Sequence, residues 1–77
     1  MKKFEVGQVW KDRSGSFVII TKVDRRKPRS HRAITGNVYE NRKLGGWATW
    51  HLDGEFSKEF GMKHADLVRQ VKRPKWL

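Results

Sequence analysis

The chain contains no cysteine, which excludes disulfide bonds and thiolate metal sites. It has no apolar run near the ~20 residues that span a bilayer, and its longest such run is residues 17–20. The charged start, residues 1–5, is not followed by a hydrophobic segment of signal-peptide length. We therefore expect a protein that is neither membrane-bound nor exported, and that occupies the reducing cytoplasm.

Acidic residues are also scarce. Eight Asp and Glu stand against 18 Lys and Arg, which gives a net charge of +10. Such an excess raises the local concentration of polyanions and speeds encounter with them. Nucleic acid is the commonest polyanion in a cell, followed by acidic proteins and anionic lipid. A lipid surface ranks last, because no amphipathic helix is evident that would insert into it.

Long segments of helical periodicity are missing as well. Short runs of β-branched and aromatic residues are interrupted by Gly, Asn or Asp every 8–12 residues or so, which is typical of a small sandwich or barrel. The length of 77 residues allows one domain, residues 1–77. We predict an all-β, five-stranded SH3-like barrel with one short helical turn near the C-terminus. The alternative is an open, strongly bent antiparallel sheet with one short helix.

The turn-forming residues between the β runs indicate where the expected strands begin and end. The predicted strands cover residues 6–11, 16–23, 32–40, 47–52 and 66–71. The segment 66–71 fits either a closing strand or a helical turn capped by Asp66. Residues 55–60 fit either strand or helix, and we favour a strand through Ser57 that breaks up near Gly61. Gly36 is expected to form a β-bulge, and Asp53-Gly54 a type I′ hairpin turn.

The segment Val6-Gly7-Gln8-Val9-Trp10-Lys11-Asp12-Arg13-Ser14-Gly15, followed by a β run ending in Val23-Asp24, has the pattern Gly-x-x-Trp-x-Asp-Arg-x-Gly. It resembles small SH3-like proteins encoded by bacteriophages and prophages, and more loosely the first hairpin of KOW-type domains. The resemblance covers mainly residues 6–24. It implies an SH3-like fold and a phage accessory protein whose target is nucleic acid or a host protein.

A basic loop over residues 24–32 is the strongest local feature. Five cations fall within eight residues, and no acidic residue occurs from 25 to 39. Such a loop suits phosphate contacts, each of which releases condensed counterion. The alternative without a binding role is a solvated loop that keeps the protein in solution. A second basic loop, residues 41–46, and a basic tail, residues 72–77, are expected to extend the same surface.

The aromatic residues divide between core and surface. Trp10 and Trp50 are expected in the core, since so small a chain needs large side chains there. Tyr39 and Trp47 are open to either place, and Trp47, which follows two glycines, is the best candidate for an exposed ring. Trp76 lies outside the strand pattern and is expected either to cover an end of the barrel or to stay exposed.

No catalytic or metal-binding pattern stands out. His51, Asp53 and Glu55 alternate along the chain, but Asp53 belongs to a predicted turn and is expected to bond its own backbone. We find no nucleophile motif, no phosphate-cradling glycine loop and no metal-ligand spacing. The chain is therefore expected to be no enzyme and to need no cofactor.

These observations favour a nucleic-acid-binding module, with DNA as the expected target and modest sequence specificity. The alternative is a phage-type accessory protein that binds an acidic host protein. The predicted nucleic-acid-binding residues are Arg25, Arg26, Lys27, Arg29, Arg32, Arg42, Lys43, Trp47, Arg69, Lys72 and Arg73.

Overall fold

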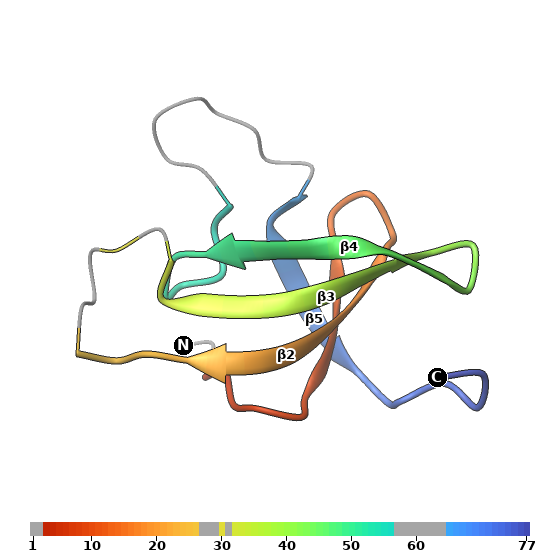
Figure 1. The fold of residues 1–77 in the computed structure, drawn as a ribbon, viewed down its shortest axis with the longest axis horizontal. Coiled ribbons are helices and arrows are strands. Elements are labelled where there is room, and N and C mark those ends of the chain that lie inside the picture. The colour runs from red at the N-terminus through yellow and green to blue at the C-terminus, as the bar shows by residue number, and fades with distance from the viewer. Residues whose placement is uncertain (1–2, 27–29, 31, 57–64) are drawn as a thin grey trace.

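The computed structural model describes residues 3–26, 30, 32–56 and 65–77, and these form an all-β fold. Five antiparallel strands make one sheet in the order β4-β3-β2-β1-β5 (Figure 1). The strands are β1 (Val9–Asp12), β2 (Phe17–Val23), β3 (Ile34–Glu40), β4 (Lys43–Trp50) and β5 (Leu67–Val71). The predicted all-β class with five strands is confirmed, and residues 67–71 form a strand and not a helical turn.

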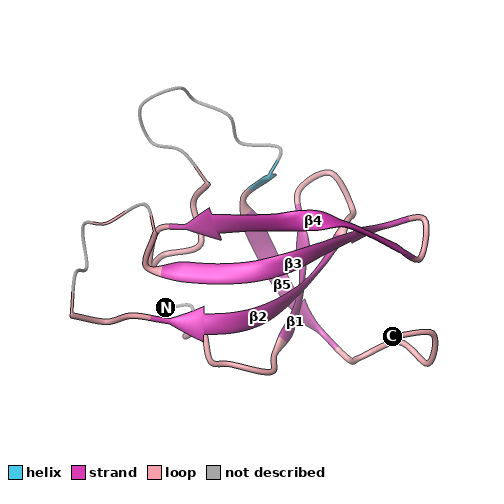
Figure 2. Ribbon diagram, in the orientation of Figure 1, coloured by secondary structure: helices cyan, strands magenta, loops and turns pink. Residues whose placement is uncertain are grey.

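The sheet bends back on itself, as the sheet of a small barrel does. Figure 1 shows β5 crossing behind β2 and β3, and Leu67 of β5 belongs to the same core cluster as Ile34 of β3. A short 3₁₀ stretch at Ala65 directly precedes β5 (Figure 2). β4 and β5 are the two edges of the hydrogen-bonded order.

The core is built around two tryptophans, as predicted. Trp10 and Trp50 are 5% and 1% exposed. The indole of Trp10 packs on Phe4, with ring centroids 4.4 Å apart, and donates its Nε1–H to Gln8 Oε1 at 2.9 Å. Trp50 Nε1 donates to the Ala65 carbonyl at 2.7 Å. Both rings therefore bury a large apolar area without leaving their single polar atom unpaired.

The prediction of a bulge at Gly36 is wrong. The register shifts in the pairs that involve β3 lie between Ile20 and Lys22 and between Val38 and Tyr39. Gly36 instead allows two strands and a ring to approach closely. A Cβ there would lie 2.7 Å from Val18 Cγ1, and the neighbouring space is filled by the backbone of β2 and by Trp50.

The predicted loop over residues 41–46 is also wrong. Asn41 and Arg42 alone join β3 to β4, with φ of 51° and 65°. Positive φ at both central residues is the mark of a type I′ turn, whose twist matches that of the flanking strands. Residues 43–46 are therefore the first half of β4. Two adjacent glycines suggested a loop, but a two-residue turn suffices when its backbone is left-handed.

Asp53-Gly54 does not form the predicted type I′ turn. Asp53 has no positive φ, whereas Gly54 has a φ of 88°. The turn is wider: His51 N donates to the Glu55 carbonyl, and Gly54 N donates to the His51 carbonyl, both at 2.9 Å. Asp53 Oδ1 accepts from Glu55 N at 3.0 Å, which confirms that this carboxylate serves its own backbone. Residues 55–56 are not in a strand, and 57–60 lie outside the described residues.

Candidate nucleic-acid interface

One face of the sheet points away from the core, and strand alternation decides which residues lie on it. Trp10 and Val18 are opposite one another and face the core, so Lys11 and Phe17, the next opposed pair, face outward. We call this side the outer face. One row across it follows the register in the order Arg69, Lys11, Phe17, Tyr39 and Leu44.

Two further rows complete the outer face. The second runs in the order Val71, Val9, Ile19, Asn37 and Trp47, and the third in the order Lys22, Thr35 and Thr49. None of the residues in the three rows carries a carboxylate. Cations lie at one end of two rows, aromatic rings lie in the middle of the first row and at the end of the second, and threonine and asparagine lie between.

Trp47 is the most exposed tryptophan in the part of the chain that the structure describes. Its exposed fraction is 73%, and it lies on the edge strand β4. Two residues away along the strand, Gly45 has no side chain and Thr49 a small one, so they leave the sides of the indole open. The predicted exposed ring is confirmed.

A second aromatic group lies on the first row. The ring of Trp76 packs edge-on against Phe17 and Tyr39, with centroid distances of 5.3 and 6.1 Å. The ammonium of Lys11 lies 4.9 Å from the centroid of Phe17. The C-terminal segment therefore returns onto the outer face. Trp76 is half-buried on this face, so it is neither fully exposed nor a cover for an end of the barrel.

A turn in the tail makes this return possible. Leu77 N donates to the Pro74 carbonyl at 3.1 Å, and Arg73 Nε donates to the Leu77 carbonyl at 2.8 Å. Lys72, Arg73 and Lys75 are all exposed. The tail thus places cations beside the aromatic group and holds Trp76 against it.

An open groove borders the second aromatic group. It has a volume of about 650 Å³ and lies between the β1–β2 turn, the β3–β4 turn and the tail. Arg42 and Tyr39 belong to its walls. The carboxylate of Glu40 also lines it, with Oε1 3.5 Å from Ser16 Oγ, so this groove is less uniformly basic than the outer face.

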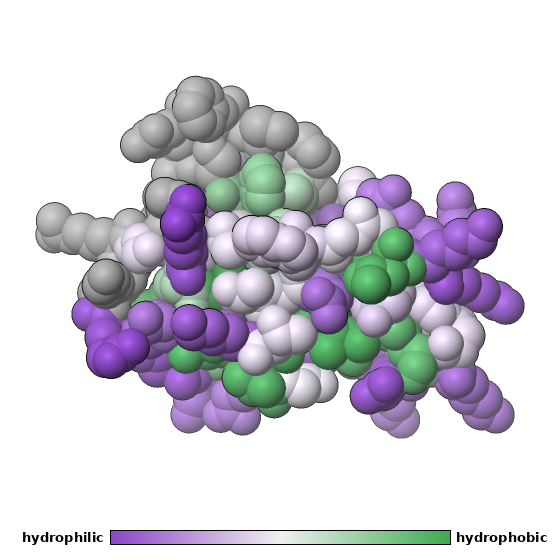
Figure 3. All heavy atoms as spheres, viewed as in Figure 1, coloured by the Kyte–Doolittle hydropathy of each residue, from purple (hydrophilic) through white to green (hydrophobic). Residues whose placement is uncertain are grey.

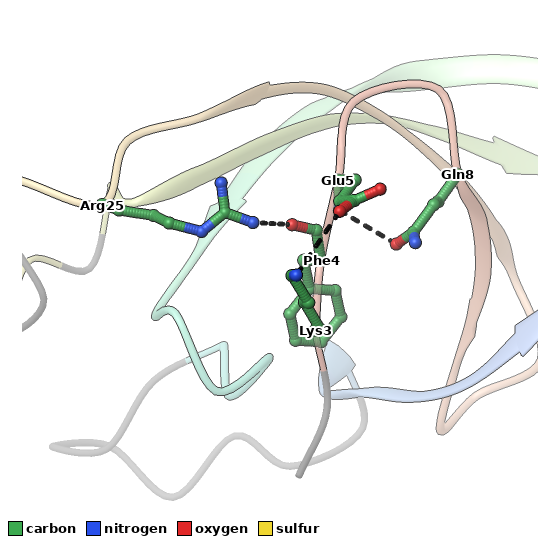
Figure 4. A network of polar contacts seen from close by, with 5 residues as sticks. All are labelled: Lys3, Phe4, Glu5, Gln8 and Arg25. Carbon is green, nitrogen blue, oxygen red and sulfur yellow. Dashed lines mark hydrogen bonds and ion pairs between the residues drawn. The ribbon is translucent and has the colours of Figure 1, made fainter.

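Two of the predicted cations of the loop 24–32, Arg25 and Arg26, have structural partners. Arg25 donates a guanidinium N–H to the Phe4 carbonyl at 2.6 Å and so fixes the N-terminal segment, whose ring is in the core (Figure 4). In the same network Glu5 N donates to Gln8 Oε1 at 3.0 Å, and the ammonium of Lys3 lies 3.9 Å from the Glu5 carboxylate (Figure 4).

Arg26 is paired within its own loop. Its backbone N–H and its Nε donate to Asp24 Oδ1 at 3.0 and 3.2 Å. Both hydrogen bonds stabilise the ionised carboxylate, the backbone bond more than the guanidinium bond. The pKa of Asp24 therefore lies below its ordinary value. Arg32 is exposed. The predicted site residues Lys27 and Arg29 lie outside the described residues.

The structure does not bring the two predicted basic loops together. The loop 24–32 precedes β3 and the turn at Asn41 and Arg42 follows it, so the seven residues of β3 separate them. At ~3.3 Å per residue this is roughly 20 Å. Figure 3 shows strongly hydrophilic side chains at both ends of the viewed face and pale or green ones between them.

The structure therefore divides the predicted residues into two cationic ends and a face between them. Arg42 and Lys43 lie at the β3–β4 turn, Arg69 and Trp47 lie on the outer face, and Arg25, Arg26 and Arg32 lie near the other end. Sequence reasoning missed Lys11 and Lys22, which the register places on the outer face. Alternation from a buried neighbour was the available signal, since Lys11 follows the core residue Trp10.

Comparison with known proteins gives no guide to this surface, since no protein-family model, curated protein sequence or solved structure matches the chain. Within residues 3–26, 30, 32–56 and 65–77, no three His, Asp or Glu side chains gather in a way that would hold a metal ion. In the same residues no helix is both long and apolar enough to cross a bilayer.

Proposed function

We propose that this protein is a non-enzymatic nucleic-acid-binding module with modest sequence specificity. The observation that carries the proposal is the outer face. Its described rows hold Lys11, Lys22 and Arg69 around exposed aromatic surface and hold no carboxylate. The cations of this face attract phosphate, and no side chain of its three rows repels it.

Phosphate contacts supply most of the expected affinity. Arg42 and Lys43 at the β3–β4 turn, the tail cations and Arg32 at the opposite end extend the positive charge beyond the face. Contacts of this kind position a protein on nucleic acid without reading its sequence. The described residues include no helix that would enter a major groove, which supports modest specificity. DNA is the expected target.

The experiment is fluorescence anisotropy with a short duplex DNA, a single strand and an RNA of matching sequence, across a salt series. We expect binding that weakens steeply with salt, because counterions are released. Arg42→Ala and Lys22→Ala should each weaken it. Lys3→Ala is the matched control, because it removes the same charge from an ammonium already beside the Glu5 carboxylate. Absence of binding to all probes at low salt would contradict the proposal.

A second candidate function has its own support. Leu44 and Trp47 are exposed large apolar residues on the edge strand β4, where a partner protein would find both an anchor and unpaired backbone. The resemblance to phage accessory proteins implies a host protein as that partner, and the net charge of +10 favours an acidic one. This candidate predicts that an acidic polypeptide binds as tightly as an oligonucleotide of equal charge, and that Leu44→Ala weakens its binding.

A further inference from the structure

The outer face offers an unpaired base more than it offers a duplex. Resting on the proposed function, we infer that it binds single-stranded nucleic acid, with one base stacked on Trp47 and the backbone crossing the sheet toward Lys22 and Lys11. Trp47 is then the residue that holds the base, and the lysines hold phosphates.

Trp47 has the surroundings of a stacking platform. The indole is 73% exposed, its neighbours Gly45 and Thr49 are small, and its cross-strand partner is Asn37. A half-buried amide beside an exposed ring has donors and acceptors for the edge of a stacked base. Stacking on aromatic side chains tolerates any sequence, because every base has a π-face.

A second ring lies within reach of the same strand. Tyr39 is two residues, or roughly 7 Å along the strand, from Asn37, the cross-strand partner of Trp47, and it lies on the same face. Tyr39 is backed by Trp76 and Phe17, so its position is set by packing. Two rings at this spacing suit neighbouring bases of one unpaired strand.

The face also suits one strand because its charges lie beside its rings. Lys22 lies two strands from Trp47 and in the next row, which corresponds to about 12 Å at the usual strand geometry. A duplex hides its base faces and presents phosphate to a protein surface, so it would contact the cations and leave Trp47 unused. Dependence of binding on Trp47 therefore distinguishes single-stranded nucleic acid from duplex.

The test compares three probes of equal phosphate number: an oligothymidine about ten nucleotides long, within the usual site size of small β-barrels, the same strand with abasic sites, and a hairpin duplex. Trp47→Leu removes the π-face and keeps an apolar side chain. Trp47→Phe keeps a smaller π-face. Val6→Ala is the control, because it changes an exposed apolar residue that lies outside the three rows of the outer face. Thermal unfolding verifies that each variant is folded.

We expect Trp47→Leu to weaken binding of the oligothymidine by about five- to 150-fold, the range found for one stacked base. Trp47→Phe should recover part of the loss, and Val6→Ala should cause none. The abasic strand should bind wild type weakly and Trp47→Leu equally weakly, since the ring then has no base to hold. The slope of log affinity against log salt should stay unchanged in Trp47→Leu.

Variants of the cations, unlike Trp47→Leu, should change the slope of log affinity against log salt. Lys22→Gln should lower the salt slope by about 0.7 for each phosphate of a single strand that it no longer neutralises. Equal affinity of Trp47→Leu and wild type for the oligothymidine would overturn the inference. If the hairpin duplex nevertheless bound with a steep salt slope, the proposed function would stand without it. If none of the probes bound at low salt, both would fall.

Discussion

Replacing Gly36 with alanine tests whether close contact between β2, β3 and Trp50 holds the sheet together. The new Cβ would lie 2.7 Å from Val18 Cγ1, 2.9 Å from the Ile19 carbonyl oxygen and 3.3 Å from Trp50 Cζ3. Val18 and Trp50 are in the core and the carbonyl belongs to the β2 backbone, so no partner is free to move away.

The magnitude follows from two opposed effects. Overpacking a well-filled core costs about 1–3 kcal/mol. The change from glycine to alanine also restricts the unfolded chain, which offsets about 0.4–1 kcal/mol of that cost. We therefore expect a net loss of about 1–2 kcal/mol. A domain of this size shifts its melting temperature by about 4–8 °C per kcal/mol, so the melting temperature should fall by roughly 5–15 °C.

The assay is thermal unfolding followed by circular dichroism, with Gly45→Ala as the matched control. Gly45 also lies in the sheet, but its nearest neighbour to an added Cβ is the Val38 carbonyl oxygen at 3.6 Å, an ordinary contact. Gly45→Ala should leave the melting temperature unchanged or slightly higher. If Gly36→Ala melted at the temperature of Gly45→Ala, the close approach would not be structurally important.

Three other predictions concern the polar contacts. Asp66 is buried and its Oδ1 accepts from Phe56 N at 2.8 Å, so Asp66→Ala should cost about 1–3 kcal/mol in urea unfolding, and an unchanged midpoint would refute this role. Arg25→Ala should lower the free energy of unfolding by about 1 kcal/mol, because the Phe4 carbonyl loses a charged but solvent-screened donor, and Arg25→Gln should restore part of that loss. Equal stability of the wild type and both variants would show that this hydrogen bond contributes nothing. The Asp24 carboxyl should titrate by NMR with a pKa below its ordinary value of 3.8. Because the pKa of this carboxyl is lower in the folded than in the unfolded protein, its contribution to stability is present above the unfolded pKa and is lost as the pH falls through the folded pKa. Asp24→Asn should remove this pH dependence of stability, and a folded pKa at or above 3.8 would contradict the prediction.

The contacts of Arg25 and Arg26 also affect how binding data are interpreted. Arg25 holds the N-terminal segment, and Arg26 is paired with Asp24. Loss of nucleic-acid binding in a variant of either residue therefore has a structural explanation beside the electrostatic one. Lys22, Arg42 and Lys43 are exposed strand or turn residues and give cleaner tests of phosphate contact.

Local pattern and composition were enough to predict the fold class, the central strand and the main core residues. The strand 16–23 was predictable because apolar residues crowd a short run between turn residues, and β2 covers Phe17–Val23. Trp10 and Trp50 were predictable as core residues because a chain of this size has few side chains large enough to fill one. The net positive charge needs no structure at all, since it follows from counting residues.

The geometry of the β3–β4 turn could be predicted only in part from the local sequence. Gly45-Gly46 indicated a loop, although both residues belong to β4 and Gly46 pairs with Val38 of β3. The deciding fact is the left-handed backbone of Asn41 and Arg42, which closes the hairpin in two residues. Arginine seldom adopts this conformation on its own, so the paired strands impose it, and pairing is a non-local property.

The grouping of charges and rings depends on tertiary structure. The basic segments 24–32 and 41–46 are separated by the length of β3, whereas Trp76 near the end of the chain packs on Phe17 of β2. Lys11, Lys22 and Arg69 share a face because three pairings align them. Charge is a property of composition, but its arrangement depends on strand order and register, which arise from contacts between residues distant in the chain.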